Sequence, residues 1–126
     1  MGVRNLTIDG TKAGFAKKEF SPEELRREFL KSIKKENPKL NAYLEVFDER
    51  GPVARHPHGA QLLFAPHGGP PLAPPLDGIP CAVKDNILIE DTRCTAGSKI
   101  LENYISTFDA TVINKLKEAV AVFLGK

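Results

Sequence analysis

The sequence predicts an α/β fold in which two N-terminal helices precede a unit of strand, helix and strand. Residues 79–83 form an apolar run that is bounded by Gly78 and by an Asp-Asn pair, which is typical of a buried strand that ends in a turn. Residues 110–119 have apolar side chains at helical spacing, and residues 120–124 form a second apolar run. If both runs lie in one sheet, they are parallel strands joined by a crossover helix.

The start of the chain predicts two helices, of which the second has the clearer beginning. A short helix is expected at about residues 8–17, with Thr7 as a possible cap. The second helix begins after Ser21, because Ser-Pro-Glu-Glu places proline at the first helical position and glutamate at the third, as in a capping box. It is expected to end at Asn37-Pro38, since proline disfavours the helical conformation of the residue before it.

The next segment and the charged face of the second helix each leave two interpretations open. Residues 41–47 alternate between two faces, which indicates either a half-buried strand or the start of another helix. The charged face could bind RNA, but acidic residues interleave the basic ones, and this pattern favours an ordinary solvated surface. The basic residues of that face are Arg26, Arg27, Lys31, Lys34 and Lys35.

Composition divides the chain into three parts, at residues 1–50, 51–75 and 76–126. The middle part holds seven prolines, four glycines and all three histidines, and it contains no acid and no lysine. Helix is excluded over most of it, so we expect a disordered insert or a segment of shifted reading frame. No carboxylate or cysteine accompanies the histidines, and we therefore expect no metal site.

Lys84 is the first candidate for chemistry, because it stands where the first apolar strand stops. Burial lowers the pKa of a lysine, and a neutral lysine can act as a base, although a strand-end lysine often reaches solvent instead. Asp85 and Asn86 follow directly, and their side chains are expected to brace the turn by bonding to backbone groups. Ser98 is a possible nucleophile, but it fits better as the cap of a short helix over residues 99–104, and Asp109 as the cap of the next helix.

The stretch Gly-Ile-Pro-Cys-Ala-Val-Lys-Asp-Asn-Ile at residues 78–87 resembles the opening of the amidase signature family. The likeness continues through residues 95–104 and 108–112 and to the end of the chain, is weaker over residues 5–48, and is absent from 51–75. This resemblance implies that the chain is the N-terminal part of a mixed β-sheet covered by helices on both faces. Many relatives have glycine where Val120 stands, and a β-branched residue there is strained if the turn needs a positive φ.

The resemblance also implies an activity and assigns Lys84 a role in it. In the family the matching lysine is the catalytic base of a Ser–cisSer–Lys triad, and both serines are expected beyond residue 126. The segment 98–104 is most similar to the branch found in tRNA-dependent amidotransferases, which hydrolyse glutamine and pass ammonia to a glutamyl-tRNA. That branch implies partner subunits B and C and tRNA, with no cofactor in this chain and with ATP and Mg handled by the partner subunit. A stand-alone amidase and a non-catalytic remnant are the alternatives.

Bulk properties exclude several other classes of protein. The net charge of +2 is too small to indicate a nucleic-acid surface. Two cysteines, Cys81 and Cys94, do not form a disulfide framework, and Cys81 is expected to be a small core residue. No apolar run reaches the roughly 20 residues needed to span a bilayer, and no signal-peptide pattern is present, so a cytoplasmic location is expected.

Overall fold

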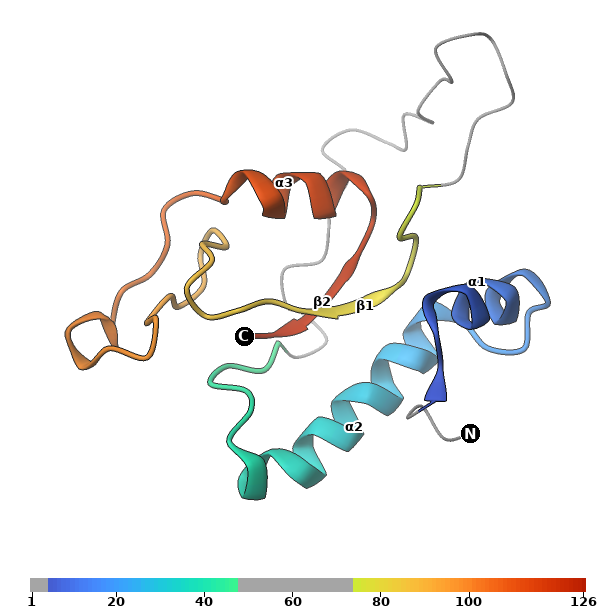
Figure 1. Cartoon of the computed structure of the whole chain (residues 1–126), viewed down its shortest axis with the longest axis horizontal. Helices are drawn as coiled ribbons and strands as arrows, with labels where there is room; N and C mark the ends of the chain where they lie inside the picture. The colour runs from blue at the N-terminus through green and yellow to red at the C-terminus, as the bar shows by residue number, and fades with distance from the viewer. Residues whose placement is uncertain (1–4, 48–73) are drawn as a thin grey trace, which may run out of the picture.

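The computed structural model describes residues 5–47 and 74–126, which form a small α/β unit. In Figure 1, α3 runs along one side of a pair of strands and α2 along the other, while α1 folds back beside the start of α2. The elements in chain order are α1 (Ile8–Ala16), α2 (Pro22–Leu40), β1 (Pro80–Ala82), the 3-10 helix η2 (Lys99–Leu101), α3 (Thr111–Glu118) and β2 (Val122–Gly125). The Pro/Gly/His-rich part at residues 51–75, expected to be an insert, lies almost entirely outside the described residues.

The two strands are parallel, which confirms the predicted strand–helix–strand unit. Cys81 pairs with Phe123, and the register is irregular between Cys81 and Ala82. Val46 forms an antiparallel bridge to Gly125, so the segment at 41–47 is extended and not helical. Among the described residues the sheet has two strands, and the larger mixed sheet implied by the family resemblance is not seen in them.

Both N-terminal helices begin at the residues that the sequence predicts. The Thr7 hydroxyl accepts a hydrogen bond from the Gly10 N–H at 3.0 Å. The Ser21 hydroxyl accepts from the Glu24 N–H at 3.2 Å, and the Glu24 carboxylate accepts from the Ser21 N–H at 2.8 Å. These reciprocal bonds satisfy backbone donors that a helix start leaves without partners, as a capping box does.

The predicted end of the second helix is wrong, because α2 continues through Pro38 to Leu40. Proline removes one backbone donor, yet here it costs the helix only a bond in its last turn. The Asn37 amide donates to the Tyr43 carbonyl at 2.9 Å, and its oxygen accepts from the Tyr43 N–H at 2.8 Å. Asn41 then ends the helix in the left-handed conformation, with its N–H bonded to the Asn37 carbonyl.

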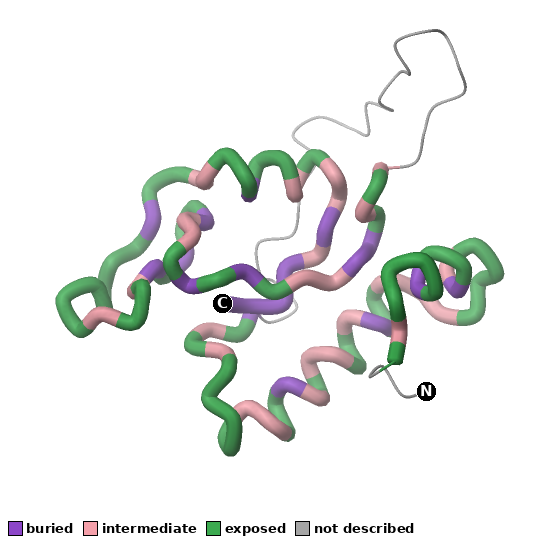
Figure 2. The backbone as a smooth tube through the Cα atoms, in the orientation of Figure 1, coloured by how far each residue is buried: buried purple, intermediate pink, exposed green. Residues whose placement is uncertain are grey.

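The core lies between the strands and α3, and its main cluster is small. Its buried members are Phe47, Val83, Ile89, Ile113 and Phe123. Figure 2 shows that buried residues concentrate along β2 and the segment after β1, whereas the two N-terminal helices are mostly exposed or half-buried. The largest fully buried side chain among the described residues is Phe123 on β2, which makes β2 the centre of the unit.

Two caps predicted for the C-terminal half are wrong. Asp109 does not cap α3, whose N-cap is Ala110 with no side-chain hydrogen bond. The Asp109 carboxylate instead accepts from the Glu90 N–H and pairs with the Lys117 ammonium. Ser98 makes no capping bond either, and only the 3-10 helix η2 follows it. Long-range contacts have thus taken over the polar groups of Asp109 that a local cap would use.

The turn from α3 to β2 does need a positive φ, as the expectation for Val120 requires. Val120 has φ 62°, and its N–H donates to the Lys117 carbonyl at 3.0 Å. Its own carbonyl accepts from the Gly78 N–H at 3.1 Å, so the turn is anchored to the residue preceding the first apolar strand. A β-branched residue in this conformation is strained.

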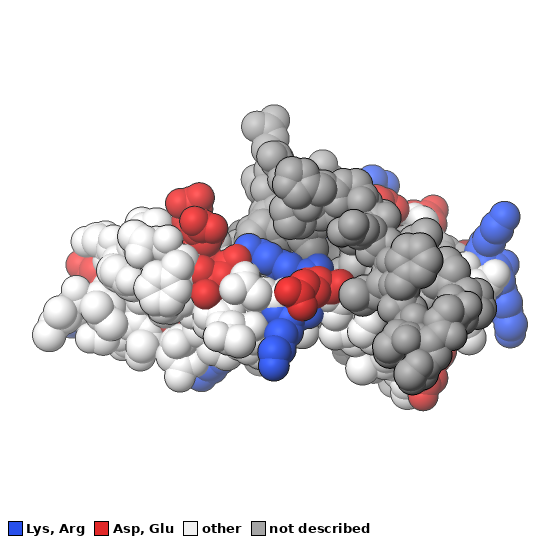
Figure 3. All heavy atoms as spheres, turned by 90° about the horizontal axis from the view of Figure 1, so that it is seen from above, with Lys and Arg blue, Asp and Glu red and all other residues white. Residues whose placement is uncertain are grey.

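Surface charge and hydropathy agree with the exclusions made from composition. On the face shown in Figure 3, acidic and basic side chains lie next to each other near the middle, outside the grey atoms. No helix within the described ranges is both long enough and apolar enough to cross a membrane.

Candidate active-site turn

Lys84 lies two residues beyond the end of β1, on a backbone that is fixed on both sides. The preceding Val83 is buried in the core, and its N–H donates to the Gly125 carbonyl of β2 at 3.0 Å. The Lys84 carbonyl accepts from the Ile87 N–H at 3.0 Å, which closes the turn over residues 84–87. The Lys84 side chain is exposed and has no hydrogen bond or ion pair to any residue in 5–47 or 74–126. A rigid turn therefore carries an amine that is open to a partner.

Asp85 is buried beneath this turn and connects it to the loop at 94–96. Its carboxylate accepts hydrogen bonds from both the N–H and the hydroxyl of Thr95. Its carbonyl accepts from the Ala96 N–H and from the Cys94 thiol, each at 3.2 Å. A carboxylate that is buried and bonded in this way holds structure and is not free to take a proton from a substrate.

Asn86 contributes less than Asp85 to the turn. It is exposed, and its side chain forms no hydrogen bond within the part of the chain that the structure describes. Bracing of the turn by side-chain to backbone bonds is therefore seen for Asp85 alone.

A second lysine, Lys126, reaches the same place and was missed by the sequence reasoning. It follows β2 directly, and its side chain is 0% exposed. Its ammonium donates to the Arg93 carbonyl at 2.5 Å and lies 3.8 Å from a carboxylate oxygen of Asp85. The available signal was its position, because Lys126 follows a buried apolar run just as Lys84 does.

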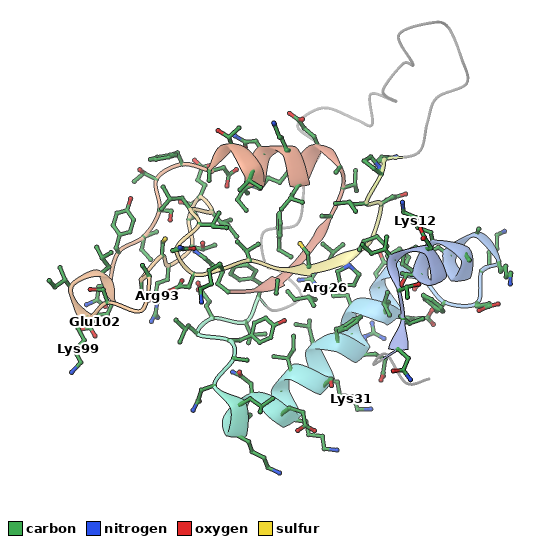
Figure 4. The ribbon with its side chains drawn as sticks, viewed as in Figure 1. Lys12, Arg26, Lys31, Arg93, Lys99 and Glu102 are labelled. Atoms are coloured by element: carbon green, nitrogen blue, oxygen red, sulfur yellow. The ribbon has the colours of Figure 1, made fainter. Side chains whose placement is uncertain are left out.

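A surface hollow of about 320 Å³ opens beside Asp85, and its wall is charged and polar. Its lining includes Glu45, Arg93 and Ser98, and Figure 4 shows Arg93, Lys99 and Glu102 on the loop segment beyond β1. No hydrogen bond joins Ser98 to Lys84 among the described residues, so the structure does not bring these two together as nucleophile and base.

The sulfur of Cys81 is removed from this chemistry. Burial raises the pKa of the Cys81 thiol to about 11, which keeps it protonated near neutral pH. Burial also raises the pKa of Tyr43, and the nearby Cys81 adds to that effect. Both groups therefore behave as neutral packing residues, as expected for Cys81.

The parallel strand pair and the lysine-bearing turn are accompanied by a family match over most of the chain. The sequence profile described as Amidase matches residues 24–126, and the chain belongs to this family. The resemblance seen in the sequence is thereby confirmed. Its relatives include the glutaminase-type component named A of the glutamyl-tRNA(Gln) amidotransferase of Lactobacillus gasseri, 39% identical over all of this chain and 24% of the relative. The same component of Koribacter versatilis is 38% identical over all of this chain and 25% of its own.

Solved structures give the same placement. The crystal structure of the A component of glutamyl-tRNA(Gln) amidotransferase from Thermotoga maritima matches all of this chain and 23% of its own, with a TM-score of 0.71 and 35% identity. A protein from a vestigial complex, described as revealing the origins of an s-triazine catabolic enzyme, matches 95% of this chain with a TM-score of 0.72 and 27% identity. The chain spans about a quarter of the length of the curated relatives that it matches.

Proposed function

We propose that these residues are the N-terminal part of the A component of a tRNA-dependent amidotransferase, which hydrolyses glutamine and supplies ammonia for converting Glu-tRNA(Gln) to Gln-tRNA(Gln). The observation that carries this proposal is the turn at 84–87, which holds Lys84 on a fixed backbone with its amine unpartnered among the described residues. The similarity of the whole chain to components of this kind supports the same assignment.

Lys84 acts in this proposal as the base of a Ser–cisSer–Lys triad. Cleaving an amide requires a positioned nucleophile, a base that accepts its proton and donors that stabilise the oxyanion. Residues 1–126 supply the base, and the family resemblance places both serines further along a longer chain. Lys84 accepts the serine proton through the cis-serine and later returns it to the leaving ammonia.

Partners follow from the same proposal. The protein works with subunits B and C, and the complex acts on tRNA, while this chain needs no cofactor of its own. ATP and Mg are handled by the partner subunit, and the glutamine substrate is the only small molecule that the chain itself processes.

A chimaera tests the proposal directly. Residues 1–126 replace the matching part of the Thermotoga maritima protein, because the two structures agree over the whole of this chain. With partner subunits supplied, ammonia release from glutamine is expected, and Lys84→Ala should reduce it by about a thousandfold or more. Lys84→Arg should be as damaging, because arginine stays protonated and cannot accept the proton.

Matched controls separate the role of Lys84 from a general loss of positive charge. Lys115 is an exposed lysine of α3, and Lys115→Ala should leave the rate within about twofold of the parent. Near-normal turnover in the Lys84→Arg chimaera would show that Lys84 supplies only charge. The 126-residue chain alone should release no ammonia, and release that disappears in Lys84→Ala would contradict the assignment of the serines.

A stand-alone amidase is the second candidate function. The similarity to the protein of the vestigial complex linked to s-triazine catabolism favours it, because that protein matches with a comparable TM-score. The chimaera distinguishes the two candidates. Activity that requires partner subunits and glutamine supports the amidotransferase, whereas partner-independent hydrolysis of small amides supports the amidase.

A further inference from the structure

Lys126 places a buried positive charge beneath the turn that carries Lys84. Its side chain is 0% exposed, and the carboxylate of Asp85 that it faces belongs to a side chain that is 8% exposed. A buried ammonium is costly unless it is paired and hydrogen-bonded. The Arg93 carbonyl provides the hydrogen bond and Asp85 the opposite charge, at 2.5 and 3.8 Å respectively.

Asp85 passes this contact on to two loops. The same carboxylate accepts from Thr95, while the Asp85 backbone carbonyl accepts from Cys94 and Ala96. Lys126, Asp85 and Thr95 thus form one buried polar network. Buried networks of this kind are rigid when every member has a partner, and they lose more than one contact when a member is removed.

The backbone of Lys126 is held as firmly as its side chain. Its N–H donates to the Glu45 carbonyl at 2.8 Å, and its carbonyl accepts from the N–H groups of Leu44 and Glu45 at 2.7 and 3.1 Å. The Glu45 carboxylate in turn accepts from the Arg93 N–H at 3.2 Å. Three segments that are far apart in sequence therefore meet at Lys126: the extended residues after α2, the loop near Arg93 and the end of β2.

We propose that Lys126 is a positioning residue for Lys84, because its ammonium anchors Asp85 and thereby fixes the direction in which the turn at 84–87 presents the Lys84 amine. This inference rests on the proposed function of Lys84 as a base. Lys126 itself does not touch the substrate and does not take up a proton. A misplaced base lowers the rate of the chemical step and leaves the binding of glutamine unchanged.

A second ion pair in the same chain provides the matched control. The Lys117 ammonium pairs with Asp109, and both side chains are partly or largely buried. Asp109 also accepts from the Glu90 N–H, so this pair likewise joins two segments. It has no contact with the turn at 84–87 among the described interactions. Removing Lys117 therefore tests the loss of a structural ion pair without a change at Lys84.

The experiment compares Lys126→Met with Lys117→Met in the active chimaera. We expect Lys126→Met to lower kcat for glutamine hydrolysis by about 10- to 100-fold with KM within about threefold, since a shift of about 1 Å in a catalytic group has an effect of this size. Lys117→Met should leave kcat within about threefold of the parent. Equal losses in the two variants, or a change confined to KM, would overturn the proposal.

A double-mutant cycle tests whether Lys126 acts through Asp85. Asp85→Asn leaves a buried ammonium without its charge partner, Lys126→Met leaves a buried carboxylate, and the double variant leaves neither. The loss of kcat in the double variant should be smaller by about fivefold or more than the product of the two single losses. Losses that simply multiply would show that Lys126 and Asp85 act independently, and the inference would be wrong.

A measurement on the 126-residue chain itself covers the case in which a chimaera variant does not assemble. The Ile87 N–H donates to the Lys84 carbonyl, so its hydrogen exchange reports the turn directly. Lys126→Met should speed this exchange by about tenfold or more relative to Ile113 in α3, and Lys117→Met should not. Unchanged exchange at Ile87 would overturn the proposal. Full activity in Lys84→Ala would instead refute the proposed function and leave the exchange result standing as a test of the anchor.

Discussion

The two halves of the described chain begin their helices in different ways. In the N-terminal half, Thr7 and Ser21 cap α1 and α2 with their own side chains, through bonds to residues three positions ahead. In the C-terminal half, α3 starts at Ala110 without a side-chain cap, while Asp109 bonds to Glu90, 19 residues away. Helix starts are thus set by local sequence in one half and by long-range contacts in the other.

Burial follows the same division. The C-terminal half and the segment at 44–47 supply the whole of the core cluster that is centred on Phe123. In α2, over 19 residues, only Leu25 and Ile33 are buried. Most of the stability of the helical half should therefore come from capping and from the contact of α2 with β2, because few of its apolar side chains are removed from water.

The largest expected difference between the halves concerns truncation of buried side chains. Phe123→Ala should destabilise the chain by about 3–5 kcal/mol, because it leaves a cavity in the middle of the core. Leu25→Ala should cost about 2 kcal/mol, at the low end for such a change, since α2 can move to close the space. Urea unfolding followed by circular dichroism measures both. Equal costs would mean that the helical half is as tightly packed as the other.

The comparison also explains which parts of the fold and site could be predicted from sequence. Thr7, Ser21 and Glu24 could be assigned because each bond spans a few residues, and β1 could be placed because an apolar run stops at polar residues. The same local signal placed Lys84 at the end of the strand. The partner of Lys126 is Arg93, 33 residues away, so no local pattern could reveal that this lysine is buried.

Strain at the start of β2 gives the next prediction. Val120→Gly should stabilise the chain by about 1 kcal/mol, because glycine relieves the positive φ at a smaller cost in backbone entropy. Asn41→Gly is the matched control in the helical half, where φ is 48° and asparagine already tolerates this conformation. Its effect should stay within about 0.5 kcal/mol. The urea midpoint measures both, and a destabilised Val120→Gly variant would show that Val120 packing outweighs its strain.

Removing the cap of α2 should have a smaller effect. Ser21→Ala leaves the Glu24 N–H without its acceptor and should cost about 0.5–1 kcal/mol, because this bond is exposed to water. Ser98→Ala is the control in the C-terminal half, where the serine makes no capping bond, and its effect should be negligible. Thermal melts at one pH compare the two. Similar losses in both variants would remove the distinction between local and long-range helix starts.

The smallest expected effect is a pH dependence that belongs to the helical half alone. Hydrogen bonds from the Ser21 backbone N–H and then from its side chain hold the pKa of Glu24 below its ordinary value of 4.5, and nearby Arg27 adds to this. A carboxyl whose pKa is lowered by folding adds stability that is present above pH 4.5 and is lost as the pH falls through the lower, folded-state pKa. Glu24→Gln should therefore reduce stability by a constant amount near neutral pH, and the gap should close as the solution is acidified below pH 4.5. Urea midpoints of the parent and the variant across this range measure the gap. A gap that widens in acid would mean that the Glu24 charge does not contribute to the start of α2.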